Sequence, residues 1–121
     1  NLGRLFGAVE PERTAVVELA ADGGVRRQTY GALDAACDGV ARGLARAGVR
    51  SGERIAILSQ NRAAYLAVMF GALRAAIEPV PVNHRFPAER ALRVDKSADF
   101  IQPLQYFAHI SAFGCSQLWP Q

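Results

Sequence analysis

The stretch Arg54-Ile-Ala-Ile-Leu-Ser59 decides the fold class, because it is a continuous apolar run with a polar residue at each end. Such a run is typical of a strand that is covered on both faces in a parallel sheet. A helix is expected next, over about 62–76, with Asn61 as its cap. Few positions on this helix are polar, which predicts that it is deeply packed through its large apolar residues, Leu66, Met69, Phe70 and Leu73.

Downstream of this helix, Ile77-Glu-Pro-Val-Pro-Val82 predicts a short strand. Pro79 and Pro81 have no amide hydrogen to donate, so the strand is expected at an edge or an end of the sheet. Pro87 to Arg93 then predicts a further helix with proline in its first turn.

Upstream, two short apolar and β-branched runs, Thr14–Ala20 and Val25–Thr29, predict a hairpin around an Asp-Gly turn. Gly23 and Gly24 are expected to supply positive φ in that turn. Thr29 is expected to cap a helix that ends at Gly48. Its buried stripe has helical spacing and consists of Leu33, Cys37, Val40 and Leu44.

The order of elements is therefore hairpin, helix, strand, helix, strand, helix. It predicts an α/β fold, with a mostly parallel sheet flanked by helices and preceded by a β-hairpin. Ligands of such sheets bind beyond the carboxyl ends of the strands. The two segments that follow the predicted strands, 59–61 and 82–85, are the candidate binding positions.

Composition excludes several classes of function. The chain has 121 residues, 50% of them hydrophobic and 21% charged, which is a globular composition with room for one modest domain. The net charge of +3 comes from scattered arginines, with no basic stripe, so no nucleic-acid partner is expected. The longest uncharged stretch in the first hundred residues, 63–73, is shorter than the about 18 residues that span a bilayer. With no signal-peptide pattern at the start, a cytoplasmic location without a membrane span is expected.

The residue types that carry chemistry are sparse. Cys37 and Cys115 have no metal-ligand spacing, so no metal site is expected, and their spacing leaves a disulfide between them open. Cys37 is expected to be a buried small apolar residue, and Cys115 has no partner pattern that would make it a nucleophile. His84 has no carboxylate neighbour and is interpreted as a structural loop residue, with Asn83 and Arg85 capping the turn and forming ion pairs.

Residues from about Pro11 to Arg93 resemble the N-terminal part of the adenylate-forming, AMP-binding synthetases and ligases, which include the acyl-CoA synthetases. The resemblance rests on the order and spacing of several short motifs over some eighty residues. They are Pro11-Glu-Arg-Thr-Ala-Val16, Gln28-Thr-Tyr-Gly-Ala-Leu-Asp34, Gly39-Val-Ala-Arg-Gly-Leu44, Ala47-Gly-Val-Arg-Ser-Gly-Glu-Arg-Ile-Ala56, Ser59-Gln-Asn61, Phe70-Gly-Ala-Leu-Arg-Ala75 and Pro79-Val-Pro-Val-Asn83.

The resemblance implies a cytoplasmic ligase of fatty acid metabolism that activates a carboxylic acid with ATP and Mg²⁺ and transfers the acyl group to coenzyme A. In that family the phosphate-binding Gly/Ser/Thr-rich loop and its lysine follow the part matched here. No such run occurs in this sequence, and its one lysine is Lys96. No catalytic, cofactor-binding or metal residue is therefore assigned, no cofactor is expected for this chain, and the chain alone is expected to be inactive.

The resemblance divides the chain into residues 1–98 and a divergent aromatic tail, 99–121. After Asp99 the tail holds five of the ten aromatic residues and no Asp, Glu, Lys or Arg. A frameshift, a truncated reading frame or a divergent fusion would each produce such a change. The alternative function is a self-standing α/β interaction module without catalysis, with the aromatic tail as its binding element. Trp119-Pro120 is interpreted as cover for apolar surface, and self-association through exposed apolar surface is a further expectation.

Overall fold

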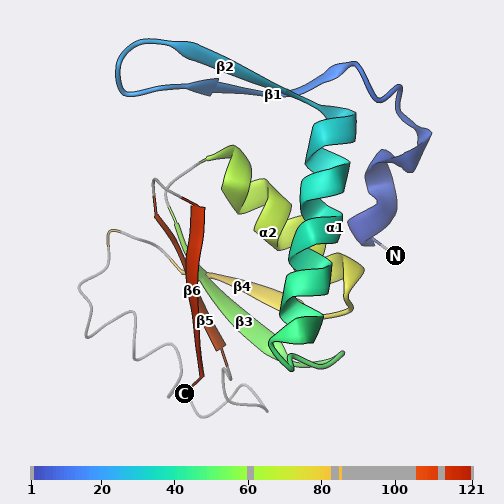
Figure 1. The fold of residues 1–121 in the computed structure, drawn as a ribbon, viewed down its shortest axis with the longest axis vertical. Helices are drawn as coiled ribbons and strands as arrows, with labels where there is room; N and C mark the ends of the chain where they lie inside the picture. The colour runs from blue at the N-terminus through green and yellow to red at the C-terminus, as the bar shows by residue number, and fades with distance from the viewer. Residues whose placement is uncertain (1, 60–61, 83–84, 86–105, 112–113, 121) are drawn as a thin grey trace.

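The described part of the chain forms a four-stranded sheet, a separate hairpin and two α-helices (Figure 1). The computed structural model describes residues 2–59, 62–82, 85, 106–111 and 114–120, the last two ranges by their backbone. In chain order the elements are the 3-10 segment η1 (Leu2–Ala8), β1 (Thr14–Leu19), β2 (Val25–Thr29), α1 (Tyr30–Arg46), β3 (Arg54–Leu58), α2 (Ala63–Arg74), β4 (Glu78–Val82), β5 (Tyr106–Ser111) and β6 (Gly114–Pro120).

The sheet has the order β4-β3-β5-β6. β3 pairs in parallel with both β4 and β5, and β5 pairs antiparallel with β6, so the expected mostly parallel sheet is confirmed. Pro79 and Pro81 lie on β4 at the edge, as their missing amide hydrogens predict. No strand was predicted in the uncharged segment at the end of the chain. The structure places β5 and β6 there, and both belong to this sheet.

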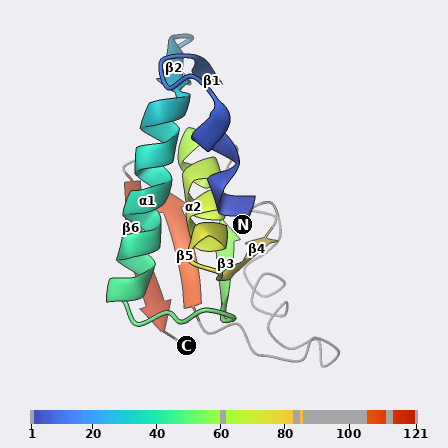
Figure 2. The ribbon, with the colours of Figure 1, turned by 90° about the vertical axis from the view of Figure 1, so that its right-hand side faces the viewer.

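β3 is the centre of the core. Ile55, Ala56 and Ile57 are each 0% exposed, which confirms a strand covered on both faces. Ile55 and Ile57 pack with residues from both helices, and α1 and α2 therefore share one face of the sheet (Figure 2). The helix predicted from Pro87 lies outside the described residues.

The ends of α1 follow local chemistry. The Thr29 hydroxyl oxygen accepts a hydrogen bond from the Ala32 amide at 3.2 Å, as expected of an N-cap. At the other end Gly48 has φ +85°, and the amides of Gly48 and Val49 donate to the carbonyls of Ala45 and Leu44. This is the Schellman arrangement, which requires a left-handed residue at that position and so favours glycine.

α2 differs from its prediction in two ways. It begins at Ala63, because Arg62 is still extended and is the N-cap without a side-chain hydrogen bond. The prediction that Asn61 caps this helix is therefore wrong, and residue 61 itself lies outside the described residues. The most buried positions of α2 are small residues, Ala67, Val68, Gly71 and Ala72, whereas the large apolar residues are only partly buried.

Small residues are buried there because α1 and α2 approach closely. A Cβ added at Gly71 would lie 2.6 Å from the Cβ of Val40 and 2.8 Å from the carbonyl oxygen of Cys37. Only a residue without a side chain fits at this contact. The glycine in α2 thus sets the distance between the two helices.

The predicted hairpin is confirmed, with β1 and β2 antiparallel and the turn at Ala21–Gly24. Gly23 has φ +82°, but Gly24 does not have positive φ, so that part of the prediction is wrong. Instead the Gly24 amide donates to the Asp22 carboxylate at 2.9 Å, which closes the turn through a side chain.

Candidate functional site

The two candidate binding segments leave the sheet side by side. Leu58 and Val82 are the last residues of β3 and β4, and they are register partners in a parallel pair. The carboxyl ends of the two strands therefore lie at the same edge, which is where parallel sheets place their ligands. The segments 59–61 and 82–85 therefore begin at neighbouring points of the sheet edge, and their role in binding stays a prediction.

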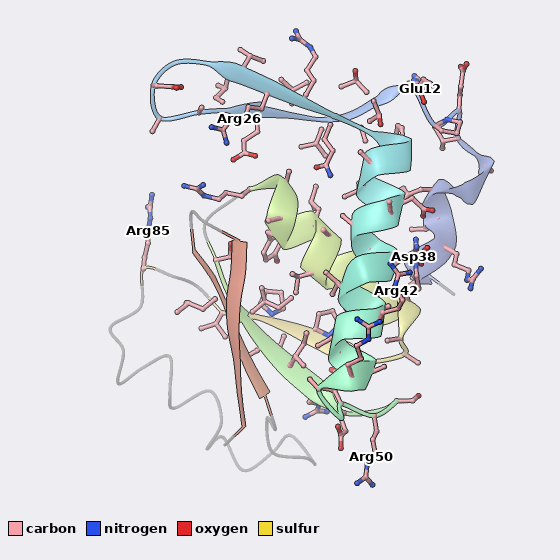
Figure 3. All side chains as sticks on the ribbon, viewed as in Figure 1. Glu12, Arg26, Asp38, Arg42, Arg50 and Arg85 are labelled. Atoms are coloured by element: carbon pink, nitrogen blue, oxygen red, sulfur yellow. The ribbon has the colours of Figure 1, made fainter. Side chains whose placement is uncertain are left out.

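Most of the side chains singled out in these segments lie outside the described residues, namely Gln60, Asn61, Asn83 and His84. Arg85 is described and exposed, and Figure 3 shows it at the left of the molecule, pointing upward. Its predicted role in turn capping and ion pairing stays a prediction. Cys115, Trp119 and Pro120 lie on β6, where the backbone alone is described.

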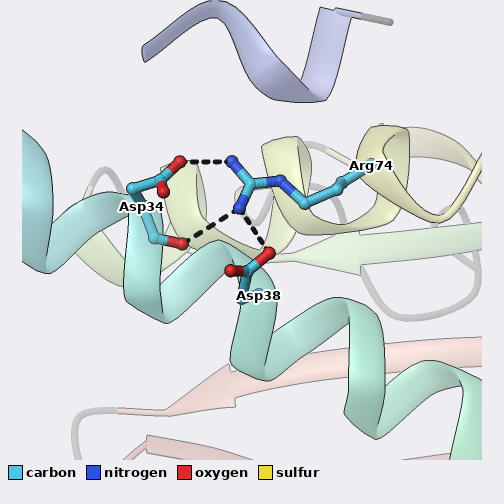
Figure 4. A network of polar contacts seen from close by, with 3 residues as sticks. All are labelled: Asp34, Asp38 and Arg74. Carbon is cyan, nitrogen blue, oxygen red and sulfur yellow. Dashed lines mark hydrogen bonds and ion pairs between the residues drawn. The ribbon is translucent and has the colours of Figure 1, made fainter. Parts of the chain in front are cut away.

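A polar cluster that the sequence did not predict joins the two helices (Figure 4). Arg74 of α2 donates from Nη2 to Asp34 Oδ1 at 2.5 Å, and from Nη1 to Asp38 Oδ1 at 2.6 Å and to the Asp34 carbonyl at 3.2 Å. Asp34 and Asp38 are four residues apart on α1, so both face the same neighbour. The Arg74 side chain is 8% exposed, while the two carboxylates are 42% and 48% exposed.

The electrostatics of this cluster favour its charged form. Burial opposes the charge on Arg74, but the hydrogen bonds to Asp38 and Asp34 outweigh it and raise the pKa of the guanidinium. The hydrogen bond from Arg74 holds the pKa of Asp38 below its ordinary value. The cluster is therefore a permanent ion pair at neutral pH, and it connects helices without presenting a group for acid–base chemistry.

Cys37 lies beneath this cluster on the buried face of α1. It is 0% exposed and is a free thiol, which confirms the expected burial and excludes a disulfide to Cys115 in this structure. Burial raises the pKa of the thiol, although the nearby Arg74 acts in the opposite direction. Because the thiolate is the reactive form, Cys37 is suited to packing and not to nucleophilic attack.

An open groove separates the hairpin from the start of α2. It holds about 490 Å³ and is lined by Val16, Val17, Glu18, Leu19, Arg62, Ala63, Tyr65 and Leu66. The lining is mainly apolar, with one carboxylate and one guanidinium. Such a surface can accept an apolar chain, but it offers no arrangement of nucleophile, base and oxyanion donor.

Among the described residues, no group of three or more His, Cys, Asp or Glu side chains could hold a metal ion. In the same part of the chain, no helix is both long and apolar enough to cross a membrane. The described residues form the rigid part of the fold. In an α/β fold, a sheet edge and helices like these hold in place the loops that carry a site.

Of the three residues that join the helices, Asp34 and Arg74 belong to the motifs quoted above for the adenylate-forming enzymes. A sequence model of the AMP-binding enzyme family matches residues 6–99. The chain belongs to the AMP-binding enzyme family. The resemblance inferred from the short motifs is confirmed, and it covers most of the chain.

A curated relative is the AMB antimetabolite synthetase AmbE of Pseudomonas aeruginosa, which is 34% identical over 98 residues, or 80% of this chain and 4% of AmbE. Among solved structures, the N-terminal domain of FACL13 from Mycobacterium tuberculosis is 28% identical with a TM-score of 0.69, and the match covers 79% of this chain and 24% of that one. O-succinylbenzoate coenzyme A synthetase from Bacillus subtilis is 24% identical with a TM-score of 0.74, over 93% of this chain and 28% of the synthetase. This last likeness shows the fold alone.

The AMP-binding chain therefore spans only a small share of these proteins, from 4% of AmbE to 28% of the Bacillus synthetase. The Bacillus synthetase has been solved with ATP and magnesium and with AMP. The described residues of the present chain, which include no lysine and no carboxylate cluster, do not fit a nucleotide–magnesium site.

Proposed function

We propose that this chain supplies the N-terminal portion of an enzyme that activates a carboxylic acid as an acyl-adenylate. The observation that carries the proposal is the family match over residues 6–99, combined with the small share of each relative that the chain spans. FACL13, which is 28% identical to this chain, has been solved as its N-terminal domain. Residues 1–98 are the family part under this proposal, and 99–121 are its divergent continuation.

The role of this portion is structural. β3 and β4 end at one edge, and α1 and α2 brace that edge through Gly71 and the Arg74 ion pair. Residues that hold the nucleotide and carry out the chemistry belong to the part of the enzyme that the relatives have beyond this match. ATP and Mg²⁺, a coenzyme A acceptor, a fatty acid or other carboxylic acid substrate and a cytoplasmic location are proposed for that whole enzyme.

ATP–pyrophosphate exchange with a panel of carboxylic acids tests the proposal. Exchange requires the acyl-adenylate to form and to reverse, so a chain without a nucleotide site should give none. We expect the 121-residue chain to show no exchange above a protein-free control, while an intact acyl-CoA synthetase in parallel does. Robust exchange by the chain alone would show that its residues contain the site.

The alternative, an interaction module that binds through its aromatic tail, stays a prediction. β5 pairs with β3 and β6 pairs with β5, so a variant that lacks residues 100–121 would lose two strands of the sheet and could not test binding by the tail alone. No contact among the described side chains favours this function over the first.

A further inference from the structure

We draw no further inference here: the strongest candidate, the exposed apolar face of the β1–β2 hairpin with the groove between it and the start of α2, carries none, because nothing in the described part of the structure shows what covers it.

Discussion

Gly71→Ala destabilises the chain by about 1–3 kcal/mol, although alanine is the better helix former by about 1 kcal/mol. The added Cβ would lie 2.6 Å from the Cβ of Val40 and 2.8 Å from the Cys37 carbonyl oxygen. Neither atom is the end of a flexible side chain, so the two helices must move apart. That movement opens the core around Leu44 and Ala72. Urea unfolding followed by circular dichroism measures the loss.

Gly43→Ala is the matched control for this substitution. Gly43 lies in the interior of α1, and an added Cβ there meets nothing within 4 Å. Only the helix preference then changes, so this variant should gain up to about 1 kcal/mol. If Gly71→Ala were as stable as the original chain, the close approach of α1 and α2 would be contradicted.

Arg74→Met lowers the free energy of unfolding by about 2 kcal/mol. Methionine keeps most of the packing of the arginine stem, so the variant isolates the loss of the guanidinium. Asp34 and Asp38 are left as two like charges one helical turn apart, but they are 42% and 48% exposed and stay hydrated. The loss is therefore smaller than for a fully buried pair. Arg50→Met, at an exposed arginine that Figure 3 shows pointing into solvent, should change stability by less than about 0.5 kcal/mol.

The ion pair between Arg74 and Asp38 makes the stability of the fold depend on pH, and the lowered pKa of Asp38 gives the direction. Its pKa is lowered in the folded chain, so the stability that it contributes is present above its unfolded value, about 3.9, and is lost as the pH falls through the folded value. Asp38→Asn should therefore be less stable than the original chain at neutral pH and should lose less of its stability on acidification. In Arg74→Met, the Asp38→Asn change should have little further effect. Equal effects of Asp38→Asn with and without Arg74 would contradict the pairing.

Local chemistry explains which parts of the fold are readable from the sequence. Several features depend on a single residue that acts on the backbone within a few positions. Thr29 caps the start of α1, Gly48 ends it, and Pro79 places β4 at the sheet edge. The apolar run of β3 is recognisable because burial on both faces removes polar residues from it. These features predict the order of elements and also the edge at which β3 and β4 end.

Contacts between distant segments explain what was missed. Arg74 pairs with residues 36 and 40 positions away, and the only hint was a charged residue in an otherwise apolar helix, which needs partners when it is buried. β5 pairs in parallel with β3, which is distant in sequence, so no turn residue between the two strands indicates the pairing. The sequence of β5 also lacks the alternation of polar and apolar residues that predicts a strand. Gly71 is buried and Leu66 only partly buried because α1 and α2 approach too closely for a large side chain between them. Hydrophobicity alone predicts the opposite, since it favours burial of the larger residue.

The central claim is that these residues form one portion of a larger adenylate-forming enzyme. The sequence of the DNA adjoining the segment that encodes them tests it most directly. We predict that a frame downstream of residue 99 encodes a Gly/Ser/Thr-rich loop with a lysine, the element that holds phosphates in this family. If no frame on either side encoded such a loop, the chain could not be part of that enzyme and the claim would be contradicted.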